Sequence, residues 1–295
     1  MSANATNMSS VGSSSRKGRT GVKRDASKLI WYALLIFFSL VAIVPILWMV
    51  SSSLKTNLGV FMVPAKWIPE DPQWSNYLHV FTDIPFFTYF KNTAIITVLG
   101  IVGTVISSSL VAYGLSRIKF KGSNIIFYLI IATMMIPPQV TIVPQFLIFK
   151  QLGWIDSLKP LIVPEWFGSP YNIFLLRQFF IGIPKSLDEA AMIDGAGLFR
   201  IYWRIILPLS KPVLAAISIF AFMFFWNDFF KPLIFINDDS LKTLTLGIMD
   251  FKSSFNIIQW NYLMAASALI LLPCVLLFFF AQRYFIKGIS VSGLK

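Results

Sequence analysis

The chain has 295 residues, of which 56% are apolar and only 13% are charged, and its mean hydropathy is +0.72. Soluble domains carry about 25% charged residues, so this composition excludes an ordinary soluble domain and is typical of a membrane protein. The net charge of +12 does not indicate nucleic-acid binding, because the basic residues lie at the ends of apolar segments. One cysteine, Cys274, and one histidine, His79, allow neither a disulfide framework nor a Cys-based or His-rich metal site.

The N-terminal part of the chain predicts a tail, a first span and an outer loop. Residues 1–28 are rich in Ser and Gly and hold six basic residues, which predicts a disordered cytoplasmic tail. The apolar run at 29–50 is long enough to cross a bilayer and too long for the core of a signal peptide. With the loop that follows it, this span forms a first unit at 29–89. The second predicted span, 93–115, is rich in Gly, Ser and Thr, which permit close helix packing.

The next two predicted spans, at about 125–149 and 159–180, are interrupted by prolines and glycine. Broken helices at membrane depth are tolerated where the freed backbone lines a cavity or is buried in protein. A fifth span is predicted at about 212–235 and a sixth at about 261–285. The sequence therefore predicts an all-α membrane protein with six transmembrane helices, a core at 90–286 and both termini on one side.

Charge predicts which side the termini face. If the termini, the 116–122 loop and the 181–211 segment with the flanking Arg177 are cytoplasmic, that side carries 17 of the 25 basic residues and only four of the 13 acidic ones. An excess of Lys and Arg marks the cytoplasmic side of a membrane protein. The distribution therefore predicts that both termini, including a tail at 287–295, are cytoplasmic.

A charged hairpin at 186–210 separates the fourth and fifth spans. Ser186 is followed three residues later by Glu189, which predicts a capping box at the start of a helix running to about Ala196. Gly195 suits a backbone conformation or a close approach that a Cβ would obstruct. The order Glu-Ala-Ala at 189–191, Gly at 195 and Ile-x-Leu-Pro at 205–208 resembles the EAA loop of ABC importer permeases.

The resemblance extends over about residues 30–295. The segments at 112–122, 226–234 and 282–295 are similar to the carbohydrate-uptake branch of type I importers, and more narrowly to the second, six-span permease of maltose-type and other oligosaccharide systems. It implies a prokaryotic plasma-membrane complex with a second permease, two ATP-binding subunits that hold ATP and Mg, and an extracytoplasmic sugar-binding protein. It also implies that the hairpin docks on an ATP-binding subunit. The residues that this coupling role covers are Glu189, Ala190, Ala191, Asp194 and Gly195.

Polar and aromatic residues near the breaks of the fourth span, together with others in the fifth span, predict a sugar path. Aromatic faces suit the C–H surface of a sugar, and amides and carboxylates bind its hydroxyl groups. The candidates are Glu165, Trp166, Asn172, Trp226, Asn227 and Asp228. In the alternative interpretation, the two tryptophans anchor the chain at the membrane interface and Glu165 faces the outer water.

The sequence holds no Gly-x-x-x-x-Gly-Lys-Ser/Thr loop, so we expect no ATP site or cofactor in this chain and no enzymatic activity of its own. We therefore predict the permease subunit of an ATP-driven, binding-protein-dependent sugar importer. Two alternatives stay open. One is an ABC permease for another solute, such as phosphorylated glycerol or peptides, and the other is a non-ABC channel or assembly protein.

Overall fold

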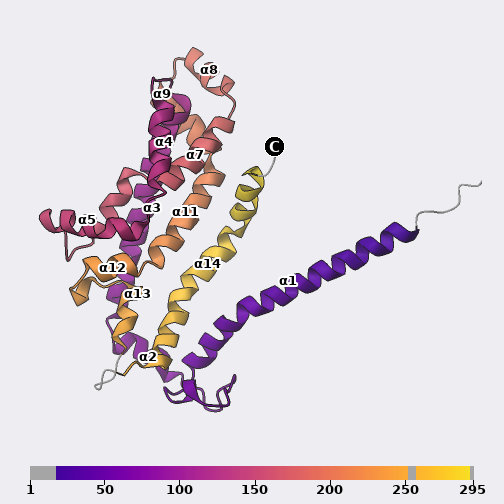
Figure 1. Ribbon diagram of the computed structural model, residues 1–295, viewed down its shortest axis with the longest axis vertical. Helices are drawn as coiled ribbons and strands as arrows, with labels where there is room; N and C mark the ends of the chain where they lie inside the picture. The colour runs from indigo at the N-terminus through magenta and orange to yellow at the C-terminus, as the bar shows by residue number, and fades with distance from the viewer. Residues whose placement is uncertain (1–17, 252–256, 293–295) are drawn as a thin grey trace, which may run out of the picture.

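The computed structural model describes residues 18–251 and 257–292, and its elements in these ranges are all helical (Figure 1). Three helices have stretches long and apolar enough to cross a membrane: α1 (Gly18–Ser53), α3 (Phe86–Arg117) and α14 (Trp260–Ser292). Two pairs of shorter helices pass the same test together. By length and composition, the described residues therefore provide between three and five crossings.

Helix α3 is the centre of the bundle and contacts α7 (Pro170–Gly182) and α11 (Lys211–Trp226) along its length. Its glycines make this packing close. A Cβ at Gly100 would lie 2.8 Å from the ring of Phe225. A Cβ at Gly103 would lie 2.5 Å from the indole of Trp166. The prediction that small residues in this span permit close helix packing is confirmed.

The predicted third span is divided by a near right angle. Helix α4 (Ser123–Thr133) and helix α5 (Pro138–Gln151) are bent by 97° relative to each other. The residue before a proline is disfavoured in the helical conformation, and Pro137 adopts an extended one before Pro138. Helix α5 consequently runs across the bundle and extends away from it (Figure 1).

The predicted fourth span is also broken where its prolines and glycine fall. It consists of α6 (Lys159–Ile162), a 3-10 turn η2 (Val163–Phe167) and α7. Gly168 joins the last two with φ +92°, a conformation that favours glycine. The turn η2 packs on the middle of α3.

The predicted fifth span divides as well. Helix α11 ends at Trp226, and a separate short helix α12 (Phe230–Phe235) follows it. The short elements η4 (Asp239–Leu241), α13 (Leu244–Gly247) and η5 (Ile248–Asp250) then lead towards α14.

Helices α1 and α14 meet beside α2 (Ser75–Thr82) and the short turn η1 (Gly59–Phe61), and α1 then leans away from the bundle (Figure 1). Residues 28–47 are all exposed, so this apolar surface is left for lipid or another subunit.

Both terminal helices are longer than predicted. The backbone of α1 begins at Gly18, so residues 18–28 continue the helix rather than forming a disordered tail, and residues 1–17 of that prediction lie outside the described residues. Helix α14 likewise continues to Ser292, through part of the predicted tail. Extending an existing helix requires no new nucleation, which explains why polar residues beside a long apolar helix join it.

Candidate functional site

A hairpin of α8 (Ser186–Ile193) and α9 (Leu198–Ile201) projects from the end of the bundle opposite α2 (Figure 1). Helix α8 lies where the sequence predicted a helix, but the predicted capping box is absent. Ser186 is already the first helical residue, and no side chain caps the helix. The amides of Asp188 and Glu189 instead bond to the carbonyl oxygen of Lys185 at 3.0 and 3.1 Å. A backbone turn therefore satisfies the first turn of the helix, and the Ser186 side chain is not needed there.

The end of α8 is a glycine turn. Gly195 has φ +78°, and its amide bonds to the carbonyl oxygen of Met192 at 3.0 Å. The amide of Ala196 bonds to the carbonyl oxygen of Ala191 at 2.9 Å. This pair of bonds is the Schellman pattern, which places a left-handed residue just after the helix. A Cβ at Gly195 would meet no atom within 4 Å, so the glycine is required for its backbone angle rather than for space.

The hairpin exposes apolar side chains beside the predicted coupling residues. Ile193 is 86% exposed and Phe199 is 70% exposed, and Leu187, Met192 and Leu198 are also exposed. Of the five predicted coupling residues, only Ala191 is partly buried; the exposed ones are Glu189, Ala190, Asp194 and Gly195. A contiguous exposed apolar patch rimmed by polar residues marks an interaction site.

An ion pair that the sequence did not reveal attaches the hairpin to the bundle. Arg117, the last residue of α3, lies 3.1 Å from the carboxylate of Asp188 on α8. Their side chains are only 2% and 12% exposed. The two residues are 71 positions apart, so no local pattern in the sequence could have paired them.

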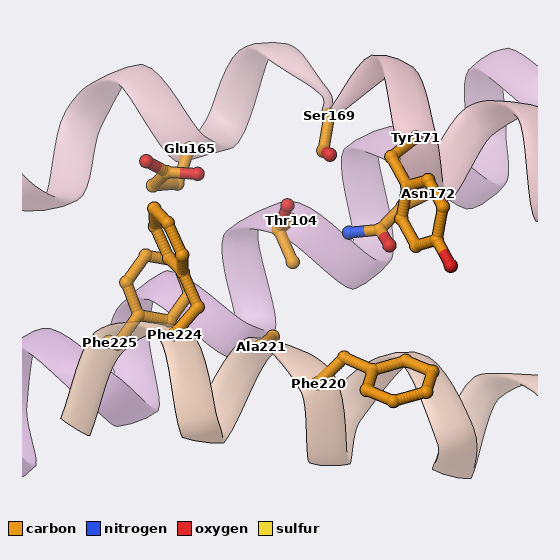
Figure 2. A pocket seen from close by; sticks show the side chains of 9 residues that line it. All are labelled: Thr104, Glu165, Ser169, Tyr171, Asn172, Phe220, Ala221, Phe224 and Phe225. Carbon is orange, nitrogen blue, oxygen red and sulfur yellow. The ribbon is translucent and has the colours of Figure 1, made fainter. Parts of the chain in front are cut away.

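A cavity of about 310 Å³ lies between η2 and α7 on one side and α11 on the other, with α3 behind it (Figure 2). Its polar lining comes from α3, η2 and α7, and its apolar lining comes mainly from α11. The lining residues are Thr104, Glu165, Ser169, Tyr171, Asn172, Phe220, Ala221, Phe224 and Phe225. Two of the six predicted path residues, Glu165 and Asn172, therefore lie in the same cavity.

The carboxylate of Glu165 is not free. The Lys231 ammonium donates to it at 3.0 Å and lies 5.2 Å from the centre of the Phe224 ring. The charge of Glu165 is therefore compensated, and the remaining polar groups of the cavity are neutral: the Thr104 hydroxyl, the Asn172 amide and the hydroxyls of Ser169 and Tyr171. Aromatic rings beside neutral donors and acceptors suit an uncharged polyhydroxylated ligand.

The structure does not bring the other predicted path residues into this cavity. Trp166 packs on Gly103. Trp226 is 4% exposed, lies in a core cluster and donates to the carbonyl oxygen of Ile270 on α14 at 3.0 Å. It is therefore neither a lining residue nor an exposed interfacial anchor.

Asn227 and Asp228 lie beyond the end of α11. Asn227 lines a separate cavity of about 380 Å³ bounded by α1 and α14. Asp228 accepts from the Lys231 amide at 3.2 Å, at the start of α12. The six candidates therefore do not form one cluster.

Comparison with known proteins gives a consistent result. The family model for the binding-protein-dependent transport system inner membrane component matches residues 105–291. A probable ABC transporter permease protein, YurM of Bacillus subtilis (strain 168), is 34% identical over 286 residues, 92% of each chain. The arabinooligosaccharides transport system permease protein AraQ of the same organism is 34% identical and covers 89% of this chain and 95% of its own.

Two further similarities bear on the class of solute. The sn-glycerol-3-phosphate transport system permease protein UgpE of Yersinia enterocolitica serotype O:8 / biotype 1B (strain NCTC 13174 / 8081) is 37% identical and covers 79% of this chain and 85% of its own. The crystal structure of a bacterial ABC transporter involved in the import of the acidic polysaccharide alginate contains a similar chain. That chain superimposes with a TM-score of 0.77 at 26% identity, covering 93% of this chain and all of that one.

Proposed function

We propose a sugar-transport role for this chain, which belongs to the family of binding-protein-dependent transport system inner membrane components. In this role the chain is one permease subunit of an ATP-driven importer in the plasma membrane of a prokaryote. It forms a translocation path with a second permease and receives sugar from an extracytoplasmic binding protein. Two partner subunits bind ATP and Mg, and one of them docks on the hairpin. Six spans follow from this role: α1, α3, α4–α5, α6–α7, α11–α12 and α14.

The observation that carries the proposal is the projecting hairpin. Its exposed apolar side chains, Ile193 and Phe199 above all, lie beside Glu189 and the glycine turn at Gly195. An unpartnered patch of this kind supports a docking surface for another protein. The excess of basic residues on the same side supports a cytoplasmic hairpin, where an ATP-binding subunit could reach it.

The chemistry of the cavity favours a neutral sugar. Its walls combine aromatic rings with hydroxyl and amide groups, and the one carboxylate, on Glu165, is already paired with Lys231. The similarity to permeases of arabinooligosaccharide and alginate systems supports an oligosaccharide. The similarity to a glycerol-phosphate permease makes an anionic solute the second candidate, for which Lys231, bonded to Glu165 of the lining, would supply a cation.

Reconstitution tests this function. The chain is coexpressed with a candidate ATP-binding subunit, second permease and binding protein from the same organism, and the complex is placed in proteoliposomes. We expect ATP-dependent uptake of radiolabelled neutral oligosaccharide that requires the binding protein. Uptake of sn-glycerol 3-phosphate alone would favour the anionic alternative. A chain that copurifies with no ATP-binding subunit would contradict the ABC role and favour a channel or assembly protein.

A further inference from the structure

One face of α3 carries a series of polar contacts to the hairpin. Ser109 and Tyr113 lie four residues apart and therefore on the same side of the helix. The Ser109 hydroxyl lies 2.7 Å from the hydroxyl of Tyr202, and the Tyr113 hydroxyl donates to the carbonyl oxygen of Leu198 at 2.9 Å. Both partners belong to the second limb of the hairpin, after the glycine turn.

The next residue on this face, again four positions on, is Arg117, and its partner Asp188 belongs to the first limb. The same guanidinium donates through Nη2 to the carbonyl oxygens of Phe180 and Ile183, at 2.5 and 2.8 Å. Phe180 lies in the last turn of α7, so Arg117 also caps that helix. A single side chain therefore joins the ends of α3 and α7 to the start of α8.

The Arg117–Asp188 pair is poorly suited to a purely stabilising role. Both groups are shielded from water, and within the described residues neither Nε of Arg117 nor Oδ1 of Asp188 has a hydrogen-bond partner. Desolvating two charges offsets much of their attraction, particularly when part of each group remains unsatisfied. What the pair does provide is a direct connection between the end of α3 and the start of α8.

The two helices that Arg117 joins to α8 form two sides of the cavity. Thr104 comes from α3, and Tyr171 and Asn172 come from α7. The second limb of the hairpin leads instead to α11, through a π-helical turn at Tyr202–Ile206 and a 77° bend. That route is irregular, whereas the route through Arg117 runs directly into two regular helices.

We propose that Arg117 is a positioning residue that transmits displacement of α8 to α3 and α7, and so to the walls of the cavity. This inference rests on the proposed coupling role of the hairpin. Docking on the partner subunit uses the exposed face of α8, which Asp188 does not share because it is buried. Breaking the pair therefore leaves docking and ATP hydrolysis in place while the movement of the cavity walls is lost.

The test uses the complete reconstituted complex and measures sugar uptake and ATP hydrolysis in the same vesicles. The variants are Asp188→Asn, which removes the charge at constant shape, Arg117→Gln, and Asp188→Glu as the conservative rescue. Arg177→Gln is the matched control. Arg177 on α7 also bonds to an α3 carbonyl, that of Leu115 at 3.4 Å, but its other contacts are with Asn124 and the ring of Phe127 rather than with the hairpin.

We expect Asp188→Asn and Arg117→Gln to retain the ATP-binding subunit and to reduce uptake per ATP hydrolysed on the order of tenfold, within the range of coupling between sites. Asp188→Glu should recover part of the ratio, and Arg177→Gln should keep the wild-type value. Wild-type ratios in both test variants would overturn the inference. Loss of the ATP-binding subunit from the Asp188→Asn complex would also overturn it, because Asp188 would then take part in docking. Failure of the wild-type complex to hold any ATP-binding subunit would instead overturn the proposed function and this inference with it.

Discussion

Lys231 and Glu165 form an ion pair of 3.0 Å that joins α12 to the turn η2 at the cavity. Their side chains are 26% and 17% exposed, so water screens the pair only in part. The pair connects two segments that are 66 residues apart and belong to different broken spans. It also sets the electrostatic character of the cavity, because it cancels the only carboxylate in the lining.

We predict that Glu165→Gln shifts the solute preference. With the carboxylate removed, Lys231 loses its ion-pair partner beside the cavity and the local charge becomes more positive, which favours anionic solutes over neutral ones. The ratio of alginate-oligosaccharide to neutral-oligosaccharide uptake in proteoliposomes should rise by several-fold. The exposed pair of Lys66 and Glu70 provides the control, since Glu70→Gln removes a carboxylate of the same kind at 2.8 Å from its lysine in the loop that follows α1. Equal ratios in the two variants would remove Glu165 from the solute path.

We predict that Asn172→Ala reduces sugar uptake and that Asn227→Ala does not. Both residues are asparagines of the predicted path, but only Asn172 lines the cavity with Glu165, and Asn227 lines the other cavity. Loss of one hydrogen bond to a sugar hydroxyl costs about 1 kcal/mol, or roughly a fivefold loss of uptake at low sugar concentration. Membrane levels and complex assembly are measured in parallel. A larger loss of uptake in Asn227→Ala than in Asn172→Ala would indicate that the sugar path runs through the cavity beside α1 instead.

We predict that Trp226→Ala lowers stability rather than transport selectivity. Its indole is buried against Phe222 and Phe90 and bonds to α14, so its removal leaves a large hole and removes a hydrogen bond between α11 and α14. Truncation of a buried tryptophan to alanine lowers the free energy of unfolding by about 3–5 kcal/mol. The melting temperature of the purified complex and its yield from membranes should fall. Trp31→Ala, at a site 64% exposed on α1, should leave the melting temperature unchanged.

The broken helices could be predicted because their causes are local. Pro137-Pro138 and Gly168 act on their own backbone, and the structure interrupts helices at both. The direction of α5 after the first break could not be predicted, because packing sets it. The face of α11 that packs inward could not be predicted either, because a helix that is apolar all round has no polar side to indicate which face is exposed.

The contacts of Trp226 and the Arg117–Asp188 pair could not be predicted from the sequence either, because packing sets them as well. Trp226 was predicted to line a path because it stands next to Asn227 and Asp228 in the sequence, but neighbours in a chain point in different directions when a helix ends between them. In the sequence, Arg117 falls in the predicted 116–122 loop and Asp188 falls in the predicted hairpin, 71 positions away. Only the packing of α3 against α7 and α8 brings the two groups together.

We predict that the hairpin and both termini are cytoplasmic, and cysteine labelling tests this orientation. Cys274 is the single cysteine and is buried, so Cys274→Ala gives a background without thiols. In that background, cysteines placed at Glu70 and Asp239 should react with an impermeant maleimide in intact cells. A cysteine placed at Arg200 should react only after the membrane is opened. All three sites are exposed, so failure to label cannot be attributed to burial. Labelling at position 200 in intact cells would reverse the orientation and remove the basis for docking on a cytoplasmic subunit.

The hairpin turn provides the sharpest test of coupling, because it contains two glycines, two positions apart, whose φ angles have opposite signs. Gly195 has φ +78° and Gly197 has φ −72°, and a Cβ at either would meet no atom within 4 Å. Alanine is strained only in the left-handed conformation, by about 1–2 kcal/mol. We expect Gly195→Ala to destabilise the end of α8 and to lower ATP-driven uptake by about tenfold, which corresponds to 1.4 kcal/mol.

Gly197→Ala adds the same methyl group without backbone strain and should transport at close to the wild-type rate. Gly195→Asn should recover part of the loss, because asparagine tolerates the left-handed conformation better than alanine does. Uptake, ATP hydrolysis and the amount of bound ATP-binding subunit are measured together for all three variants. If Gly195→Ala matched Gly197→Ala in all three measurements, the geometry of the turn would have no part in coupling, and the hairpin would be only a connection between α7 and α11.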